Sequence, residues 1–173
     1  MSRLIRSLTI VVFLTLGLHS GCAGYRLGSQ LPSDIQTVHV HIARNNTEEP
    51  LLETEVTNAV LRELQRDGSL RVTTQEAADS QMYLEVTEFR LEPLAFDAEN
   101  RIRPDEYRLV LRANTTLVRG QDGPVLVRSG NVEGRATFIL QGDMTASKRT
   151  ALPAASDDLA RHLVAAVTEA WPE

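Results

Sequence analysis

The sequence predicts a single α+β domain, in which two amphipathic helices pack on one face of a mostly antiparallel or mixed sheet of about four strands. Three observations favour this class. Several segments alternate apolar and polar residues at period two, two further segments repeat apolar residues at helical spacing, and turn-forming residues separate them. Because the sequence has no internal repeat, residues 34–173 are expected to form one domain.

The first segment is typical of a bacterial lipoprotein signal. Arg3 and Arg6 make its start positive, residues 8–18 are almost wholly apolar, and small residues precede Cys22, the only cysteine. The apolar run is too short to cross a bilayer, which needs about 20 residues. We therefore predict a signal peptide over residues 1–21 and a lipidated tether over residues 22–33.

Acylation of Cys22 would anchor the protein stably, since each buried CH₂ of the lipid contributes about 0.8 kcal/mol. His19 departs from the pattern, because such signals usually carry Leu at that position. The alternative is an ordinary secretory leader with an incidental thiol, which would be left unpaired in an oxidising compartment. Ala23 follows the cysteine where Asp would resemble an inner-membrane retention signal, so the expected location is the outer membrane.

The charge balance excludes one class of partner. Without residues 1–21, which contain Arg3 and Arg6, the chain keeps 16 of its 18 basic residues against 23 acidic ones, a net charge of −7. A general nucleic-acid binder normally carries a basic excess. Nucleic acid is therefore not expected as a partner, and membrane contact is expected only through the anchor.

The first strand and the first helix follow the tether. Residues 37–42 alternate strictly, which predicts a half-buried strand with Val38, Val40 and Ile42 facing the core. The segment Asn45-Asn46-Thr47 offers N-capping groups for a helix that is expected to end at Asp67-Gly68. Its apolar stripe consists of Leu52, Val56, Ala59, Val60 and Leu64.

The remaining strands and a second helix complete the pattern. Short strands are expected at residues 70–73 and around Met82, Leu84 and Val86. Two long strands, from Tyr107 to Arg119 and from Val125 to Leu140, are joined by a turn at residues 120–124 and should form an antiparallel hairpin. Within the second of these strands, Gly130 and Gly134 suggest bulges or bends. The last helix is expected to start at Ser156 and to bury Leu159, Leu163, Ala166, Val167 and Ala170.

In this order the segments resemble the outer-membrane LPS-assembly lipoprotein family, LptE. The matching segments are Cys22-Ala23-Gly24-Tyr25-Arg26-Leu27, the Pro-then-strand segment from Leu31 to Val40, the acidic helix entry from Thr47 to Leu64, Ala78-Asp79, and Leu159 to Trp171. Each segment alone is weakly specific, but their order and spacing cover nearly the whole chain after the signal.

The resemblance implies that the protein lies in the lumen of a large outer-membrane β-barrel, LptD, and helps to insert lipopolysaccharide (LPS) into the outer leaflet, with LPS as a possible direct ligand. An acidic protein that binds an anionic lipid needs cations gathered in one place. The candidates are Arg90, Arg108, Arg112 and Arg128, because Arg108 and Arg112 point the same way on one strand. The simpler interpretation is that these arginines cover a solvated sheet face.

Catalytic chemistry is not expected, and neither is a cofactor. The only cysteine is assigned to the anchor, and the acidic pairs Glu48-Glu49 and Asp157-Asp158 are explained by helix starts. His39 and His41 share a strand face, but the sequence shows no third ligand that would make a metal site. The alternative function is a periplasmic accessory lipoprotein that scaffolds or activates another cell-envelope complex.

Overall fold

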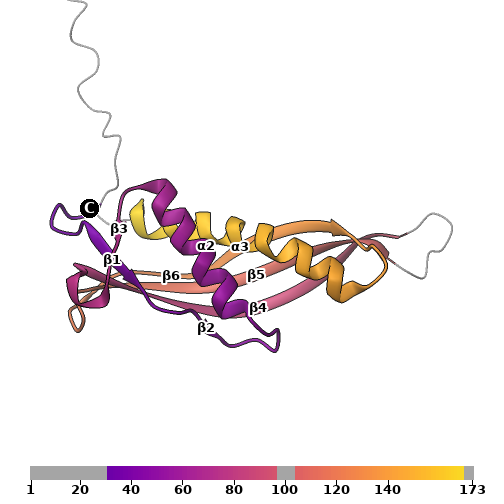
Figure 1. The fold of residues 1–173 in the computed structure, drawn as a ribbon, viewed down its shortest axis with the longest axis horizontal. Helices are drawn as coiled ribbons and strands as arrows, with labels where there is room; N and C mark the ends of the chain where they lie inside the picture. Colours follow the sequence, from indigo (N-terminus) through magenta and orange to yellow (C-terminus); the bar gives the residue numbers. More distant parts are fainter. Residues whose placement is uncertain (1–30, 97–103, 170–173) are drawn as a thin grey trace, which may run out of the picture.

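The computed structural model of the chain describes residues 31–96 and 104–169. The predicted signal segment, Cys22 and Trp171 lie outside the described residues. The described part forms one sheet with two helices on one of its faces, which confirms the α+β class (Figure 1).

The sheet has six strands, in the order β3-β1-β4-β5-β6, with β2 paired to β4 off this path. The elements are β1 (Thr37–Val40), β2 (Arg44–Asn45), α2 (Leu52–Asp67), β3 (Arg71–Val72), the 3₁₀ turn η2 (Gln75–Ala77), β4 (Ser80–Phe96), β5 (Pro104–Arg119), β6 (Val125–Ile139) and α3 (Met144–Thr168). The predicted number of about four strands is too low. Strand β3 confirms the short strand expected at residues 70–73, whereas β2 is a two-residue pairing too short to show an alternation.

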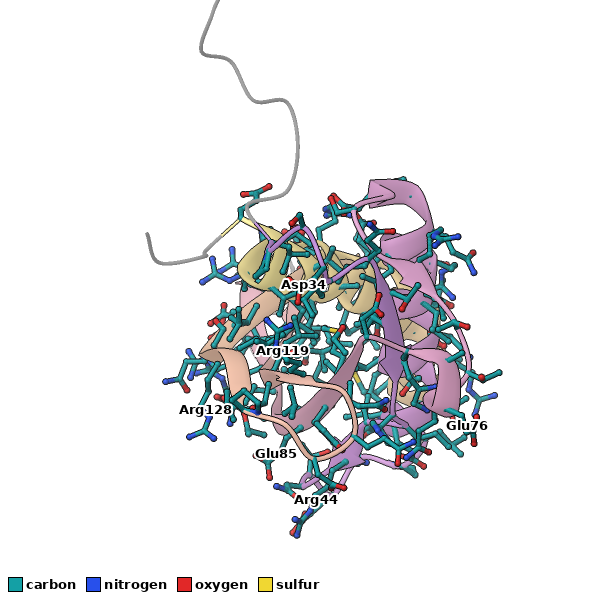
Figure 2. All side chains as sticks on the ribbon, turned by 90° about the vertical axis from the view of Figure 1, so that its left-hand side faces the viewer. Asp34, Arg44, Glu76, Glu85, Arg119 and Arg128 are labelled. Atoms are coloured by element: carbon teal, nitrogen blue, oxygen red, sulfur yellow. The ribbon has the colours of Figure 1, made fainter. Side chains whose placement is uncertain are left out.

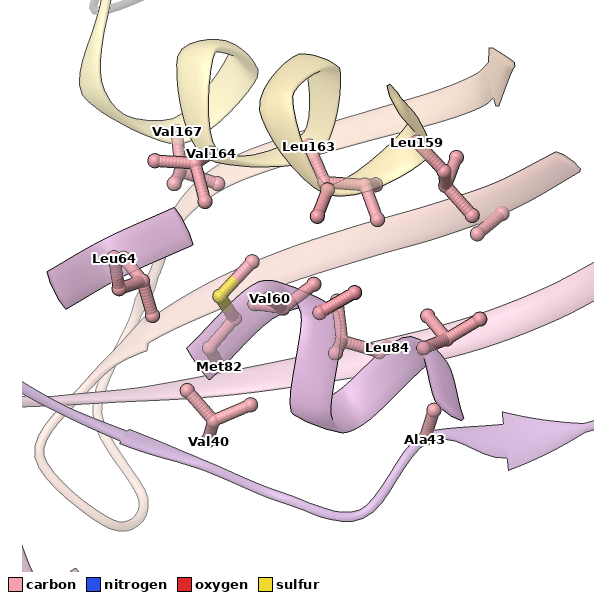
Figure 3. Close-up of a cluster of buried hydrophobic side chains, with 14 of the residues drawn as sticks. Val40, Ala43, Val60, Leu64, Met82, Leu84, Leu159, Leu163, Val164 and Val167 are labelled. Carbon is pink, nitrogen blue, oxygen red and sulfur yellow. The ribbon is translucent and has the colours of Figure 1, made fainter. Parts of the chain in front are cut away.

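The sheet is mixed. The short strands β1, β2 and β3 pair in parallel, whereas β4, β5 and β6 form a long antiparallel meander. The hydrophobic core lies between the sheet and the helices, where Met82 and Leu84 of β4 meet Leu64 of α2 and Leu163 of α3 (Figure 3). All of these side chains are buried, and burying one leucine stabilises the fold by about 1.5–3 kcal/mol.

The prediction for Ile42 is wrong. Its side chain is 76% exposed, because one extra residue lies between β1 and β2, where the four steps from Val40 to Arg44 run beside three steps of β4. Ala43 takes the buried position instead, and its N–H donates to the Thr57 hydroxyl at 2.9 Å. A shift of one residue exchanges the two faces of a strand, so Ile42 turns to the opposite side.

The first helix begins later than its predicted cap. Asn45 does not cap α2, because its amide donates to the Glu49 carbonyl and its side-chain oxygen accepts from the N–H and hydroxyl of Thr47. These bonds close a loop before the helix, and Leu51 enters the helix with φ 67° and no side-chain cap. The predicted end is confirmed, since Gly68 has φ 75° and its N–H donates to the Leu64 carbonyl.

The second helix begins much earlier than Ser156, which is not a cap. Asp143 caps α3 by accepting from the Ala146 N–H at 3.0 Å, and the helix continues through Pro153. Ser156 lies in its interior, fully buried, and its hydroxyl has no partner in the described structure. The early part of α3 buries small residues, which carry little hydropathic signal. They are Ser147, Ala151 and Ala155.

The two strand glycines have different roles. Gly130 lies beside an irregularity of the β5–β6 register, next to Asn131 with φ 57°, so the predicted bulge is confirmed there. Gly134 instead keeps regular register opposite Leu111. A Cβ at Gly134 would lie 2.3 Å from the backbone nitrogen of Leu159 in α3. Gly134 therefore marks a close approach of α3 to the sheet.

Candidate functional surface on the open face of the sheet

The sheet face opposite the helices, here called the open face, carries most of the charged side chains of the long strands. In the end view of Figure 2, Arg44 and Glu85 project on the side away from the helices, and Arg128 projects from β6. Core-facing residues alternate with these outward residues along β4 and β5, which explains why the open face is polar.

Four arginines and three glutamates form one ion-pair network across β4, β5 and β6. Arg112 is at its centre, with its guanidinium 2.7 Å from Glu88 and 3.0 Å from Glu133. Arg90 pairs with Glu88 at 2.9 Å and with Glu92 at 3.0 Å. Two further arginines complete the network, Arg108 beside Glu92 at 3.6 Å and Arg135 beside Glu133.

The strand register explains why these side chains meet. Glu88, Arg112 and Glu133 lie in one row across the three strands, and Arg90, Val110 and Arg135 lie in the next row. Opposite charges therefore stand directly opposite one another or one row apart, which favours cross-strand pairing. Val110 is only 1% exposed although it lies on the open face, because the arginine side chains around it cover it.

Ionised hydrogen-bond partners stabilise the charged forms of Glu133 and Arg112. The Arg135 guanidinium lowers the pKa of Glu133, and Arg112 lowers it further. Glu133 in turn raises the pKa of Arg112, with Glu88 contributing. An anionic ligand would have to compete with three carboxylates for these arginines, although the four arginines exceed the glutamates by one.

The structure brings together three of the four predicted arginines. Arg90, Arg108 and Arg112 belong to the network, whereas Arg128 lies opposite Thr116, about 13 Å along β5 from Arg112. Arg128 is exposed and forms no ion pair within the described residues. The predicted lipidation site, Cys22, lies outside the described residues.

Sequence reasoning missed Arg135 and the three glutamates as members of this site. The bulge near Gly130 interrupts the alternation of β6, so the phase of Glu133 and Arg135 cannot be read from the start of that strand. The bulge between Val86 and Glu88 does the same on β4. The signal that could have found them is the alternation of opposite charges along each strand, Glu-x-Arg-x-Glu from Glu88 to Glu92.

The other end of the open face carries aromatic rings. His41 stacks on Tyr83 with ring centroids 4.4 Å apart, and the His39 ring packs edge-on against His41 at 4.8 Å. His41 Nε2 lies 2.9 Å from the side-chain oxygen of Gln81, whose amide group donates to the Gln75 carbonyl. Because that bond directs the Gln81 oxygen toward His41, Nε2 of His41 carries the proton.

A shallow hollow of about 270 Å³ adjoins these rings. Its lining residues are Ile42, Arg44, Tyr83, Leu84, Glu85, Asn114 and Thr116. Within residues 31–96 and 104–169, no group of three or more His, Cys, Asp or Glu side chains could hold a metal ion. No helix in this part of the chain is both long enough and apolar enough to cross a membrane.

Comparison with known proteins gives one family and several structures of similar fold. The model of the LptE family, described as lipopolysaccharide-assembly, matches residues 35–167. The search of curated proteins finds no match. Among solved structures, the hypothetical protein CT253 from Chlamydia trachomatis is 11% identical with a TM-score of 0.52, and the alignment covers 76% of this chain and 94% of that one.

Two further structures are more distant in shape. The PelC dodecamer from Paraburkholderia phytofirmans is 15% identical with a TM-score of 0.47, and the alignment covers 82% of this chain and 94% of that one. Uncharacterized lipoprotein B from Nitrosomonas europaea is 15% identical with a TM-score of 0.42, over 83% of this chain and 92% of that one. At this identity, the match to CT253 shows a shared fold alone.

Proposed function

The chain belongs to the LptE lipopolysaccharide-assembly family, and on that premise we propose that it is an outer-membrane lipoprotein that plugs an LptD-type β-barrel and assists LPS transport to the outer leaflet. The observation that carries the proposal is the family match, which spans residues 35–167 and therefore nearly the whole described fold. Family membership points to an assembly protein rather than an enzyme.

The geometry supports this role in one respect. A plug needs a rigid body and a polar surface that complements a water-filled barrel interior. Here the helices cover one sheet face, and the open face presents paired charges whose side chains are held by neighbours on both sides, such as Arg112 between Glu88 and Glu133. Ion pairs fixed in this way fit a wet interface, where they remain partly solvated and lose little further hydration.

The test is affinity purification of the tagged protein at native level from its own membranes in mild detergent, followed by mass spectrometry. The proposal predicts a large outer-membrane β-barrel in stoichiometric amount. Recovery of a different envelope complex, with no such barrel, would instead favour the accessory-lipoprotein function.

Neutralising the centre of the open face should weaken the barrel complex or LPS retention. We expect the double variant Arg108→Gln with Arg112→Gln to reduce the co-purified barrel or the bound LPS several-fold. Both arginines lie on the open face and pair with glutamates of the network, so the variant removes two of its positive charges. Quantitative mass spectrometry and LPS staining of the purified complex measure the two effects separately.

The matched control neutralises two arginines of the helical layer. Arg62 pairs with Asp157, and Arg161 pairs with Asp158, so Arg62→Gln with Arg161→Gln removes the same charge from the other side of the fold. This control should leave both readouts near the wild-type value. Equal losses in the two double variants would show that the open face is not the binding surface.

The anchor assignment has its own test, since Cys22 lies outside the described residues. In cells depleted of the proposed barrel partner, which would itself hold the protein in the membrane, we expect Cys22→Ser to move the protein from the membrane pellet to the periplasmic fraction, because the lipid is then the only proposed membrane contact. Ala23→Asp serves as the control, since it keeps the cysteine and should alter only the membrane in which the protein is retained. A Cys22→Ser chain that still sediments with membranes would refute the anchor.

A further inference from the structure

Part of β4 lies at the edge of the sheet without a neighbouring strand. β1 pairs with Ser80–Met82 and β2 with Glu85–Val86, and β5 pairs with β4 on the opposite side. Beyond β2, residues 88–94 have no partner on their outer side within the described residues, and these seven residues are here called the free edge of β4. Figure 1 shows this part of β4 extending past the loop that joins β2 to α2.

The backbone groups that face outward along this edge can be identified. The N–H groups of His41 and Asn46 donate to the carbonyls of Met82 and Val86, so core-facing residues of β4 direct their backbone groups away from β5. A bulge between Val86 and Glu88 shifts the phase, and after it Phe89 takes the core-facing position. The outward groups of the free edge therefore belong to Phe89, Leu91 and Pro93.

Unpaired strand edges invite pairing with another chain, and proteins normally block them. The free edge is blocked only in part. Pro93 lacks an N–H but still presents its carbonyl, whereas Phe89 and Leu91 present both groups. Part of the β6 edge, by contrast, is covered by α3, because Asp158 accepts a hydrogen bond from the Arg135 N–H and His162 contacts the Glu133 carbonyl at 2.7 Å.

We propose that the free edge of β4 pairs with the same edge of a second copy of this chain, antiparallel and around a two-fold axis at Leu91. In this register the N–H and carbonyl of Leu91 bond to those of Leu91 in the other copy. Each Phe89 N–H donates to the Pro93 carbonyl opposite, and each Arg90 faces Glu92 of the other copy. The sequence of the edge is thus complementary to itself, as an isologous interface requires.

The neighbouring registers fail for physical reasons. Centring the pair on Arg90 places arginine opposite arginine and Glu88 opposite Glu92, and centring it on Glu92 places two carboxylates together. A centre at Pro93 puts two residues without an N–H at the middle of the ladder. A centre at Phe89 requires the edge beside Val86, which β2 already occupies.

The surroundings leave room for the second strand. A hollow of about 540 Å³ lies where β2 ends, lined by Asn46, Thr47, Glu48, Glu49, Thr87, Glu88 and Phe89. Leu94, which is 39% exposed, would lie opposite Glu88 of the other copy. Seven residues a side bury far less than the roughly 800 Å² per partner of a stable complex, so the dimer is weak and reversible. The pairing does not depend on a barrel partner.

Disulfide trapping in the full chain tests the register. In a Cys22→Ser background, which removes the only cysteine, Leu91→Cys should form a disulfide-linked dimer on mild oxidation. Hydrogen-bonded antiparallel pairs have Cα atoms about 5.5 Å apart, within disulfide range. Thr137→Cys on β6, an exposed position, is the control and should remain monomeric. The proposal would be overturned if both variants formed the same amount of disulfide-linked dimer. It would also be overturned if Leu91→Cys formed its disulfide with a different protein.

Charge exchange gives a second readout that a structural role would not produce. Combined with Leu91→Cys, Arg90→Glu makes positions 90 and 92 both acidic, and Glu92→Arg makes them both basic. Each variant alone should form about one fifth or less of the disulfide-linked dimer, because like charges face each other across the strand pair. Mixing the two chains should restore trapping as a heterodimer, distinguished by tag size. Failure of the mixture to exceed either variant alone would dismiss the pairing.

Discussion

Replacing Gly134 with alanine is expected to lower the free energy of unfolding by about 3 kcal/mol, at the upper end of the cost of overpacking. The added Cβ would lie 2.3 Å from the nitrogen, 2.5 Å from the Cα and 2.5 Å from the Cβ of Leu159. Two of these atoms belong to the backbone of α3, so no side-chain rotation relieves the contact. The helix or β6 must move instead.

The movement is costly because α3 is held to β6 on both sides of Leu159. Asp158 accepts a hydrogen bond from the Arg135 N–H at 2.9 Å, and the His162 ring bonds to the Glu133 carbonyl. Leu159 and Leu163 are themselves fully buried against the sheet. Displacing α3 by the distance that a methyl group needs would strain these bonds and open gaps in the core.

Chemical denaturation of the variant, followed by circular dichroism, measures the change. Gly130→Ala is the matched control, because that glycine is exposed and its added Cβ would meet only the Asn114 side-chain oxygen, at 3.3 Å. It should change stability by about 0.5 kcal/mol or less. If Gly134→Ala were as stable as Gly130→Ala, the close approach of α3 to β6 would not exist in solution.

The sequence was most informative where one periodicity runs without interruption. The alternation from Tyr107 to Arg119 correctly predicted one long strand, and Leu109, Leu111 and Leu117, which share one face of it, are all buried in the core. The stripe of α2 and its glycine end were likewise predicted, because sixteen residues of helix repeat the same face. In these segments local pattern and tertiary burial agree.

Prediction failed where a tertiary contact sets the boundary. The first half of α3 packs through small residues such as Ala151 and Ala155, so its apolar face is weak, and Pro153 suggests an end rather than a middle. The Asp143 cap could have been recognised as a start signal. The strand register decides which side chains meet in the ion-pair network, and this register shifts at the bulges. A one-residue bulge cannot be located from composition.

The pair Ala78-Asp79, noted as a family motif, has a structural role that the sequence alone does not show. One oxygen of Asp79 accepts from the Gln36 N–H at 3.1 Å, the Thr37 N–H at 3.0 Å and the Thr37 hydroxyl at 2.8 Å. The Asp79 N–H donates back to the same hydroxyl, and its carbonyl accepts from Gly120. One residue thereby joins the start of β1, the start of β4 and the β5–β6 turn.

Removing this carboxylate with Asp79→Ala is expected to lower the free energy of unfolding by about 2 kcal/mol. Hydrogen bonds to a charged acceptor are worth about 1.5–3 kcal/mol each, and the exposure of Asp79 to solvent reduces the sum. Asp79→Asn retains a neutral acceptor and should lose about half as much. Glu76→Ala, an exposed acidic residue in η2 with no bond to β1, is the control and should be nearly neutral.

The pH dependence of the unfolding free energy separates the contribution of the Asp79 charge from that of its hydrogen bonds. The Thr37 hydroxyl, followed by the Gln36 N–H, lowers the pKa of Asp79 in the folded state below its ordinary value of 3.8. The unfolded chain therefore takes up the proton first, and the contribution of Asp79 is complete above about pH 5 and is lost as pH falls through the folded pKa. The difference in unfolding free energy between wild type and Asp79→Asn should be constant near neutral pH and shrink in acid. A difference independent of pH down to about pH 2 would show that the charge of Asp79 does not hold β1 to β4.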